Sequence, residues 1–498
     1  MRAERRAVTR GVAGFASLLL SACALAPAYH PPETAAPPQF KEAGKGAAGL
    51  AVSGWAAATP RDGDARGAWW SAFHDPVLDD LESRAEGASP TLAAALARYD
   101  AALATTRAAR ADLYPQAGLS ASDSENKPSA NRPLSIGTAP TYNDLKLGGS
   151  IGYEVDLWGR IRSRVASARA DAEAAHADLA SAHLSLQAAV ADAYARLRGF
   201  DAESALLHQT VEAYTKAYDL TRKRHDGGIA SGVDVNRAQT VLGNARAQIS
   251  AVAQTRAATE HELAALTGEL ASAFTAAPRP EPNAVPLTIP LISPGIPSAL
   301  LERRPDVAAA ERRIAAANAH IGVARAAFFP TITLGASSGF ETTGSALLSA
   351  SSSFWALGPA LAALAVFDGG RRKAQVRISR DEYDQLAATY RDTVLTAFRQ
   401  AEDALAAQRL LATQATDQQS AADAAARTSA LALIRYRDGA SNYLEVVTAQ
   451  TDALTAQRAL IQVQTQRARA AVALIKALGG GVREGANEVT PPAPASAH

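Results

Sequence analysis

The feature that most constrains this sequence is an internal duplication, in which the chain matches itself at an offset of about 211 to 215 residues. The matching pairs of segments are 109–115 with 324–330, 159–160 with 370–371, and 228–235 with 439–446. Because both halves carry the same pattern, each half has to fold into the same succession of elements. The pattern predicts a helix, two strands, one very long helix, a turn and a final helix.

The longest predicted element covers residues 160–226, which contain no proline and a single glycine, Gly199. Large apolar residues recur there at intervals typical of a coiled coil: Leu179, Leu186, Val190, Leu197, Phe200, Leu207, Val211, Tyr214 and Tyr218. Residues 376–405 repeat the pattern, and at about 1.5 Å per residue each such helix would be roughly 100 Å long. Alanine at most other apolar positions favours a curved wall of helices over a solid core.

Strands are predicted where apolar and polar residues alternate with a period of two. The clearest alternation covers residues 145–155, with 119–124 as its weaker partner. In the second half the strands are 332–340 and 354–367, separated by a loop rich in glycine and serine. A tilted strand of roughly 9–11 residues crosses a bilayer, and these segments are about that long. Taken alone, they favour an ordinary half-buried sheet.

Four strands are too few to close a barrel, because known outer-membrane barrels begin at about eight strands and open edges in lipid leave backbone groups unpaired. Two copies of the chain would give a barrel filled by side chains, whereas three copies would leave room for a lumen. The predicted fold class is therefore an α+β membrane protein. It is a trimeric 12-stranded β-barrel, with four strands per protomer, continuous with a long α-helical coiled-coil barrel in a tandemly duplicated chain.

The composition excludes several other classes of protein. Lys and Arg total 50 against 49 for Asp and Glu, so the charge balance gives no reason to expect a nucleic-acid partner. One cysteine rules out an internal disulfide, a multi-cysteine zinc site and a CxxC motif. Nine histidines occur without HExxH, and GxSxG, P-loop and dinucleotide motifs are missing. We expect no enzyme activity and no metal; His176 and His183 fit two exposed histidines better than a metal site.

Residues 1–22 have the pattern of a secretory signal, with arginines before a short apolar stretch from 11 to 20. The segment ends Leu20-Ser21-Ala22-Cys23, which resembles the bacterial lipobox. The resemblance implies that Cys23 carries an N-terminal lipid such as palmitate and that no other cofactor is needed. The alternative is an ordinary signal followed by a chance cysteine. Ala24 replaces the aspartate used for inner-membrane retention, which favours an anchor in the outer membrane extending into the periplasm.

The expected organisation of the chain has six parts. They are a lipoprotein signal peptide (1–22), a lipid-anchored extended segment (23–66), a first repeat (67–270), a Pro-rich linker (271–297), a second repeat (298–480) and a disordered tail (481–498). The linker follows from its prolines, which are incompatible with a helix interior.

A long motif then links the chain to a known family. Residues 297–330, beginning PSALLERRPDV and ending at Phe328-Phe329-Pro330, resemble the signature of TolC-like outer-membrane efflux lipoproteins of the NodT type. Segments 69–76 and 153–160 are also similar to that family, so the resemblance covers nearly all of the mature chain.

The resemblance implies a homotrimer in outer-membrane lipid that docks to a periplasmic adaptor, or membrane fusion protein, and an inner-membrane pump. Such a gated channel conducts small molecules passively to the exterior. Metal efflux and type I protein secretion use the same architecture and stay open as alternatives. A coiled-coil adaptor would also show long helices and a lipobox, but it would carry one hairpin and no duplicated strand pair.

The candidate gate residues lie at the two turns between helices. Gly228 and Gly439 allow each long helix to turn back. By resemblance, Glu445 belongs to an acidic ring at the periplasmic constriction, and Asp234 is its repeat mate. Tyr436 precedes the second turn and is expected to hold it shut through hydrogen bonds between helices. The alternative for both acids is a role at a helix N-terminus.

The remaining candidate positions lie where helices and strands meet. Pro115 and Pro330 end helices just before strands, and Gly159 and Gly370 mark the return from strand to helix. We interpret these four residues as junctions between barrel and tunnel.

Overall fold

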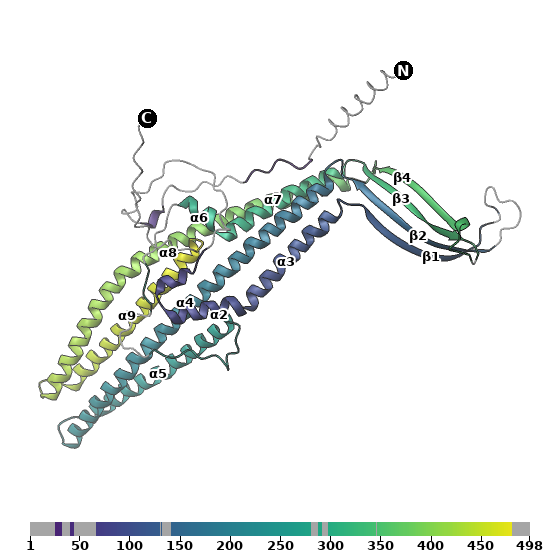
Figure 1. The fold of residues 1–498 in the computed structure, drawn as a ribbon. Coiled ribbons are helices and arrows are strands. Elements are labelled where there is room, and N and C mark those ends of the chain that lie inside the picture. The colour runs from purple at the N-terminus through teal and green to yellow at the C-terminus, as the bar shows by residue number, and fades with distance from the viewer. Residues whose placement is uncertain are drawn as a thin grey trace, which may run out of the picture. The chain divides into compact units, whose positions relative to one another are not determined.

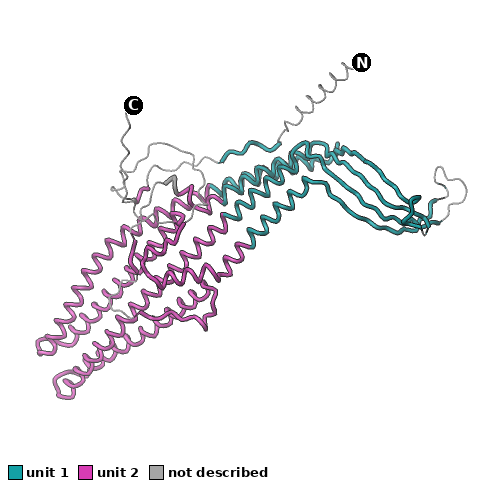
Figure 2. Tube along the Cα trace, viewed as in Figure 1, with its two compact units in different colours: residues 1–32, 97–176, 309–390 teal, residues 33–96, 177–308, 391–498 magenta. Residues whose placement is uncertain are grey.

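The computed structural model describes residues 25–31, 40–43, 66–129, 131, 141–279, 287–290, 297–344 and 346–480. The predicted signal peptide, Cys23 and the predicted tail lie outside the described residues. The chain divides into two compact units, and each is described by itself (Figure 2). Unit 1 comprises residues 1–32, 97–176 and 309–390, and unit 2 comprises residues 33–96, 177–308 and 391–498.

The predicted duplication is confirmed by the order and lengths of the elements (Figure 1). The first series is α2 (Pro76–Ala88), α3 (Pro90–Ala111), β1 (Gln116–Asn126), β2 (Tyr142–Val155), α4 (Arg160–Asp226) and α5 (Gly232–Leu266). The second is α6 (Pro297–Arg303), α7 (Pro305–Ala326), β3 (Thr331–Thr342), β4 (Ser353–Ala363), α8 (Arg371–Arg437) and α9 (Tyr443–Ala477). Short 3-10 segments are η1 (Lys41–Ala43), η3 (Trp69–Phe73) and η4 (Ala350–Ser352).

Three pairs of equivalent helices have equal lengths in the two halves. α4 and α8 each have 67 residues, α5 and α9 each have 35, and α3 and α7 each have 22. The α+β class and the long helix over residues 160–226 are thus confirmed. Within the described part of the chain, no helix combines the length and the hydropathy needed to cross a membrane.

All four strands differ from the predicted ranges by a few residues, and the differences are largest for β1 and β4. β1 extends beyond 119–124 at both ends, because residues 116–118 and 125–126 continue the ladder with β2, from Gln116 opposite Gly152 to Asn126 opposite Tyr142. β4 ends at Ala363, before the predicted limit at residue 367. Its last paired residue, Ala363, stands opposite Thr331, the first residue of β3, so no partner strand remains beyond that point.

The long helices begin at caps built from aspartates. Asp156 Oδ1 accepts a hydrogen bond from the Ile161 amide at 3.1 Å, and Asp156 Oδ2 accepts one from the Arg162 amide at 2.9 Å. Asp368 plays the same part for α8, where the amides of Gly370 and Arg372 donate to its carboxylate at 3.0 and 3.2 Å. Carboxylates at these positions also complement the positive end of the helix dipole.

The core of unit 2 contains two neighbouring tryptophans. Trp69 and Trp70 expose 3% and 8% of their surface and pack with Phe73, Leu78 and other apolar residues of one cluster. The indole Nε1 of Trp69 donates to Gln187 Oε1 at 3.0 Å, so its polar atom is satisfied inside the core.

A buried polar network ties distant segments of unit 2 together. Asp75 Oδ2 accepts hydrogen bonds from the Tyr194 hydroxyl at 2.9 Å and from Arg279 Nη1 at 2.8 Å. Asp75 also caps α2 by accepting from the Val77 amide at 2.9 Å. Burial alone would raise the pKa of Asp75, but hydrogen bonds from Arg279, Tyr194 and Val77 together lower it.

Candidate functional site

The four strands of unit 1 form one antiparallel sheet in the order β1-β2-β3-β4 (Figure 1). β2 and β3, which belong to different halves of the chain, pair in the middle, for example Ile151 opposite Ala336. β1 and β4 therefore lie at the two edges. Each of them pairs on one side only among the described residues, so the sheet ends in two open edges of unpaired backbone groups.

The two faces of this sheet differ in chemistry because side chains alternate along each strand. The register places Leu119, Leu147, Ile151, Leu334, Phe340, Trp355 and Leu357 on one face. Leu119, Trp355 and Leu357 expose 91%, 80% and 86% of their surface. Large apolar side chains this exposed require a nonaqueous neighbour, and an alternating apolar face is the pattern of a strand in contact with lipid.

The opposite face is mostly small and polar, although Phe354 and Leu361 of β4 also lie on it. Serines 120, 122 and 150 lie on it, together with Lys146, whose Nζ atom is 2.9 Å from Asp144 Oδ2 and 3.4 Å from Glu341 Oε1. The ion pair with Glu341 joins β2 to β3, the two central strands of the sheet. A face of serines and charged side chains suits contact with water.

The predicted junction residues lie between helices and strands of unit 1. Pro115 follows α3 and precedes β1, and Pro330 lies between α7 and β3. The Pro330 carbonyl accepts a hydrogen bond from Trp158 Nε1 at 2.8 Å, which ties the two junctions together. Gly159 and Gly370 have φ of 72° and 90°, which glycine adopts without steric cost.

The first helix turn joins α4 to α5 in unit 2. Gly228 has φ of 77°, and the following Ile229 amide donates to the Arg224 carbonyl at 2.7 Å. Ser231 and Asp234 form a capping box, in which Asp234 N donates to Ser231 Oγ at 3.2 Å and Ser231 N donates to Asp234 Oδ2 at 3.3 Å. In the protomer, the Asp234 carboxylate thus stabilises the start of α5.

The second turn has the same backbone but a different arrangement of side chains. Gly439 has φ of 78°, and Asn442 caps α9 by accepting from the Glu445 amide at 3.1 Å. The side chain of Glu445 is exposed, and among the described residues its carboxylate has no hydrogen-bond or ion-pair partner. Unlike Asp234, Glu445 leaves its charge available. Its acidic-ring role and that of Asp234 remain predictions.

Next to these turns, tyrosines of α4, α8 and α9 pack with apolar residues of α5 and α9 in a cluster that we call the tyrosine cluster. Its members are Tyr214, Tyr218, Ala238, Tyr436, Tyr443 and Val446. Tyr436 and Tyr443 meet edge to face with ring centroids 5.3 Å apart, and the Tyr436 hydroxyl donates to Thr221 Oγ1 at 3.4 Å. Tyr436 therefore makes a hydrogen bond between helices, as predicted for it; whether the bond holds a gate shut stays a prediction.

Arg224 also contacts this cluster, although no pattern in the sequence indicates a role for it. Its guanidinium lies 4.6 Å from the centroid of the Tyr436 ring, and its Nη1 donates to the Tyr436 carbonyl at 2.5 Å. The Tyr214 hydroxyl donates to the Gln450 carbonyl at 3.0 Å. These bonds join α4 to both α8 and α9, so they link the two helix hairpins near their turns.

Burial decides the charge state of the tyrosine cluster. It raises the pKa of Tyr214 to about 12 and, aided by nearby Tyr436, that of Tyr443 to about 12. Both phenols are neutral at physiological pH and act as hydrogen-bond donors. The cluster therefore holds the hairpins together through neutral side chains and the charge of Arg224.

The described residues offer little for metal chemistry. No group of three or more His, Cys, Asp or Glu side chains in this part of the chain lies close enough to hold a metal ion. His176 packs edge to face on Tyr99 in unit 1, with centroids 5.3 Å apart. In unit 2, His183 Nδ1 lies 3.8 Å from Glu86 Oε1. Both histidines thus have ordinary neighbours.

Comparisons with known proteins cover almost the whole chain. Residues 81–269 and 296–480 match the family described as "Outer membrane efflux protein". The chain is 33% identical over 466 residues to the antibiotic efflux pump outer membrane protein ArpC of Pseudomonas putida and 32% identical over 466 residues to the toluene efflux pump outer membrane protein TtgC of the same species. Both alignments cover 93% of this chain and 94% of the relative.

A solved structure is similar in fold. The outer-membrane channel OprN aligns with a TM-score of 0.81 and 29% identity, covering 92% of this chain and 99% of that one.

Proposed function

The chain belongs to the outer membrane efflux protein family and is an efflux channel of the outer membrane, and on this premise we propose that three copies of it enclose one pore. As a transport channel it is not an enzyme. The observation that carries the proposal is the sheet of unit 1, with two open edges, one apolar face and one polar face.

The open edges support assembly with other copies of the same chain. β1 of one copy pairs with β4 of the next, which satisfies the backbone groups that a single protomer leaves unpaired in lipid. Three copies give twelve strands, and the polar faces of their sheets then line the water-filled lumen. The exposed Leu119, Trp355 and Leu357 face the acyl chains.

The partners of this trimer are a periplasmic adaptor and an inner-membrane pump. Relatives named as outer membrane proteins of efflux pumps support that arrangement. The transported compounds are small molecules, since the two relatives are named for an antibiotic and for toluene. Protein secretion and metal efflux have no comparable support.

The helix turns form the periplasmic gate, and Cys23 forms the anchor. Three Glu445 carboxylates, each without a partner in its own protomer, make an acidic ring that attracts cations. Arg224 and Tyr436 hold each protomer's hairpins in the closed position. Acylation of Cys23 attaches the N-terminal segment to the outer membrane, and several acyl chains are needed for firm attachment.

The pairing of β1 with β4 of the next copy is tested by cross-linking. In a Cys23→Ser background, Ser120→Cys and Ala356→Cys place one thiol on each open edge of the sheet, on its polar face. A short bismaleimide reagent added to membranes is expected to produce a covalent trimer. The single variants Ser120→Cys and Ala356→Cys are the controls, because only one edge then carries a thiol.

Conductance provides the functional measurement. Purified wild-type protein is expected to form ion-conducting pores in planar bilayers. A monomer without conductance, or cross-linked products limited to dimers, would contradict the trimeric channel. Lipidation is tested separately by growth with labelled palmitate, which should label the wild type and leave Cys23→Ser unlabelled.

A further inference from the structure

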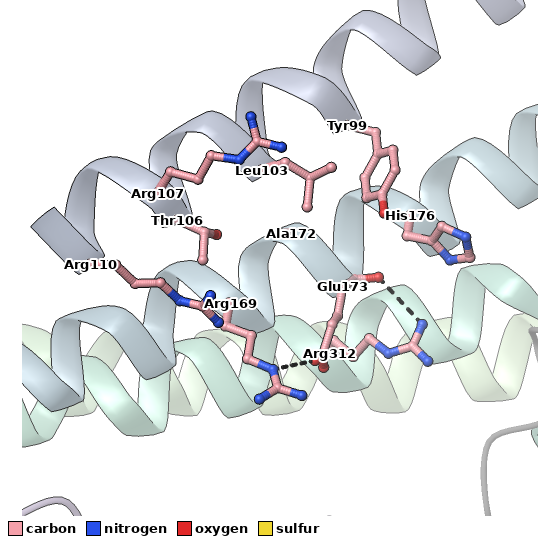
Figure 3. Close-up of a pocket in the computed structure, with 10 residues that line it drawn as sticks. All are labelled: Tyr99, Leu103, Thr106, Arg107, Arg110, Arg169, Ala172, Glu173, His176 and Arg312. Carbon is pink, nitrogen blue, oxygen red and sulfur yellow. Dashed lines mark hydrogen bonds and ion pairs between the residues drawn. The ribbon is translucent and has the colours of Figure 1, made fainter.

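A groove rich in arginine lies on unit 1, where helices α3, α4 and α7 meet (Figure 3). We call it the arginine groove. It has a volume of about 590 Å³ and is lined by Tyr99, Leu103, Thr106, Arg107, Arg110, Arg169, Ala172, Glu173, His176 and Arg312. No residue of this groove belongs to the sheet, the junctions or the helix turns described above.

The charges in the groove do not balance. Four arginines line it, and Glu173 is the one carboxylate among the lining residues. That carboxylate is already engaged, because Arg169 Nε donates to Glu173 Oε1 at 3.0 Å. Arg107 and Arg110 are exposed, and among the described residues neither guanidinium has a hydrogen-bond or ion-pair partner. The groove therefore presents an unneutralised pair of forked donors, which suits a phosphate or carboxylate group.

The internal duplication identifies what occupies the equivalent place in the second half. By the repeat offsets, α3 and α4 correspond to α7 and α8, and the N-terminal segment 25–31 lies along α7. Arg325, the counterpart of Arg110, donates from Nη1 to the Leu25 carbonyl at 3.2 Å. Asn318, the counterpart of Leu103, donates to the Pro27 carbonyl at 2.8 Å.

The same segment also contacts α7 further along its length. The Tyr29 hydroxyl donates to Glu311 Oε1 at 2.5 Å. Burial and the neighbouring Glu311 raise the pKa of Tyr29, with Tyr383 and Tyr390 of α8 adding to the effect. The face of α7 and α8 that corresponds to the arginine groove is thus covered by the chain itself.

Two substitutions between the repeats make the first-half groove different. Tyr383 on α8 corresponds to Ala172 on α4, so a large ring is replaced by a methyl group. Gly322 corresponds to Arg107, and a Cβ atom at Gly322 would lie only 2.7 Å from Ala26 Cβ. The first half therefore has a wider groove, and Arg107 adds a positive charge to it. The second half instead accommodates the N-terminal segment 25–31 at this place.

The position of the groove along its helices puts it next to the membrane. Arg110 is the penultimate residue of α3, and β1 begins at Gln116. In the second half, the peptide carbonyl bound by Arg325 belongs to Leu25, two residues after Cys23. Arg110 occupies the same level as Arg325 by the repeat. Basic pockets close to a membrane surface bind lipid head groups.

We infer that the arginine groove binds the phosphate head group of an anionic membrane phospholipid, with Arg107 and Arg110 as its main donors. The lipid takes the place that the N-terminal segment takes in the second half. The inference rests on the proposed function, because it needs the sheet of unit 1 to lie in the outer membrane.

The test uses the purified full-length channel in detergent, titrated with phosphatidylglycerol and analysed by native mass spectrometry. Wild-type protein is expected to retain the lipid. Arg107→Gln/Arg110→Gln is expected to bind it at least about tenfold more weakly, since two charge-assisted hydrogen-bonding groups are lost. The matched control is Arg391→Gln/Arg427→Gln, which removes two exposed arginines of α8 that also lack partners among the described residues, and it should bind as the wild type.

A second pair of variants and a second ligand distinguish a lipid head-group site from a site for free phosphate. Arg107→Lys/Arg110→Lys keeps the charge but loses the planar fork, so intermediate affinity is expected, and this pair also serves if the glutamine pair does not fold. Inorganic phosphate alone is the competing ligand. Displacement of the lipid by inorganic phosphate at equal concentration would assign the groove to free phosphate and overturn the lipid assignment, as would equal binding by the glutamine pair and the wild type.

Conductance of the same samples distinguishes the two proposals. Normal pores combined with unchanged lipid binding in the glutamine pair would reject the lipid site and leave the channel intact. Absence of pores in wild-type samples would instead reject the proposed function.

Discussion

Glu82 provides the sharpest test of the energetics of unit 2. It lies on the buried face of α2, with 1% of its surface exposed, and neither carboxylate oxygen has a hydrogen-bond partner among the described residues. Burial, aided by the nearby charges of Glu86 and Asp79, raises the pKa of Glu82 from 4.5 to about 9. Glu82 is therefore protonated in the folded protein at neutral pH.

The sign of the pH dependence follows from this pKa. In the unfolded chain the carboxyl loses its proton near pH 4.5, whereas in the folded protein it keeps the proton up to about pH 9. Between these values folding takes up a proton, and each pH unit lowers the free energy of unfolding by about 1.4 kcal/mol. At pH 7.5, three units above the unfolded pKa, the cost is about 4 kcal/mol.

Glu82→Gln removes this cost because an amide has the shape of the protonated acid and does not ionise. We expect the variant to be more stable than the wild type by about 2–4 kcal/mol at pH 7.5, and the difference to vanish near pH 4.5. The assay is urea unfolding in detergent, followed by the fluorescence of the five tryptophans. Glu382→Gln, on an exposed position of α8, is the control and should change stability by less than about 0.5 kcal/mol at either pH.

A variant that is less stable than the wild type at pH 7.5 would refute the reasoning. A stabilisation of equal size at both pH values would also refute it, because the effect would then not come from the ionisation of Glu82.

Other predictions concern packing, charge and selectivity. Gly199→Ala should destabilise by about 1–3 kcal/mol in urea unfolding, because its Cβ would lie 2.4 Å from Thr465 Oγ1 of α9, and adding Thr465→Ala should restore part of the loss. Asp75→Asn should lower the free energy of unfolding by about 2 kcal/mol at neutral pH, because it weakens the buried hydrogen bonds of Asp75. Because the Asp75 pKa is lowered, the wild type loses this contribution as pH falls through it, so melting curves of the two proteins should converge in acid. Glu445→Ala should weaken the cation preference of single channels, and unchanged reversal potentials would reject the acidic ring.

Much of the fold could be predicted from the sequence because its signals are local and repeated. Residues 160–226 lack proline and keep a regular apolar spacing, so the helix and its limits follow from backbone chemistry alone. The turns at Gly228 and Gly439 are equally local, since positive φ is required there. The need for further copies of the chain also follows from the sequence. The alternation predicts four strands, and four strands cannot close a barrel.

Other properties depended on which segments meet in space. Nothing in the spacing of Leu78, Leu81, Glu82 and Ala85 distinguishes a buried glutamate from the exposed Glu86 one turn later; the packing around α2 decides it. Asp234 and Glu445 occupy equivalent repeat positions, yet only the folded turns show that one carboxylate is used in a capping box.

The arginine groove shows the same division. The duplication and the positions of Arg107 and Arg110 can be read from the sequence. Whether these two arginines have partners depends on side chains of α4 and α7, more than fifty residues away in the chain. Periodicity reports the conformation of neighbouring residues, whereas burial, pairing and charge state are set by contacts between distant ones. The sequence alone therefore determined the repeated elements, and the tertiary structure decided which of their charged side chains are neutralised and which remain free to bind.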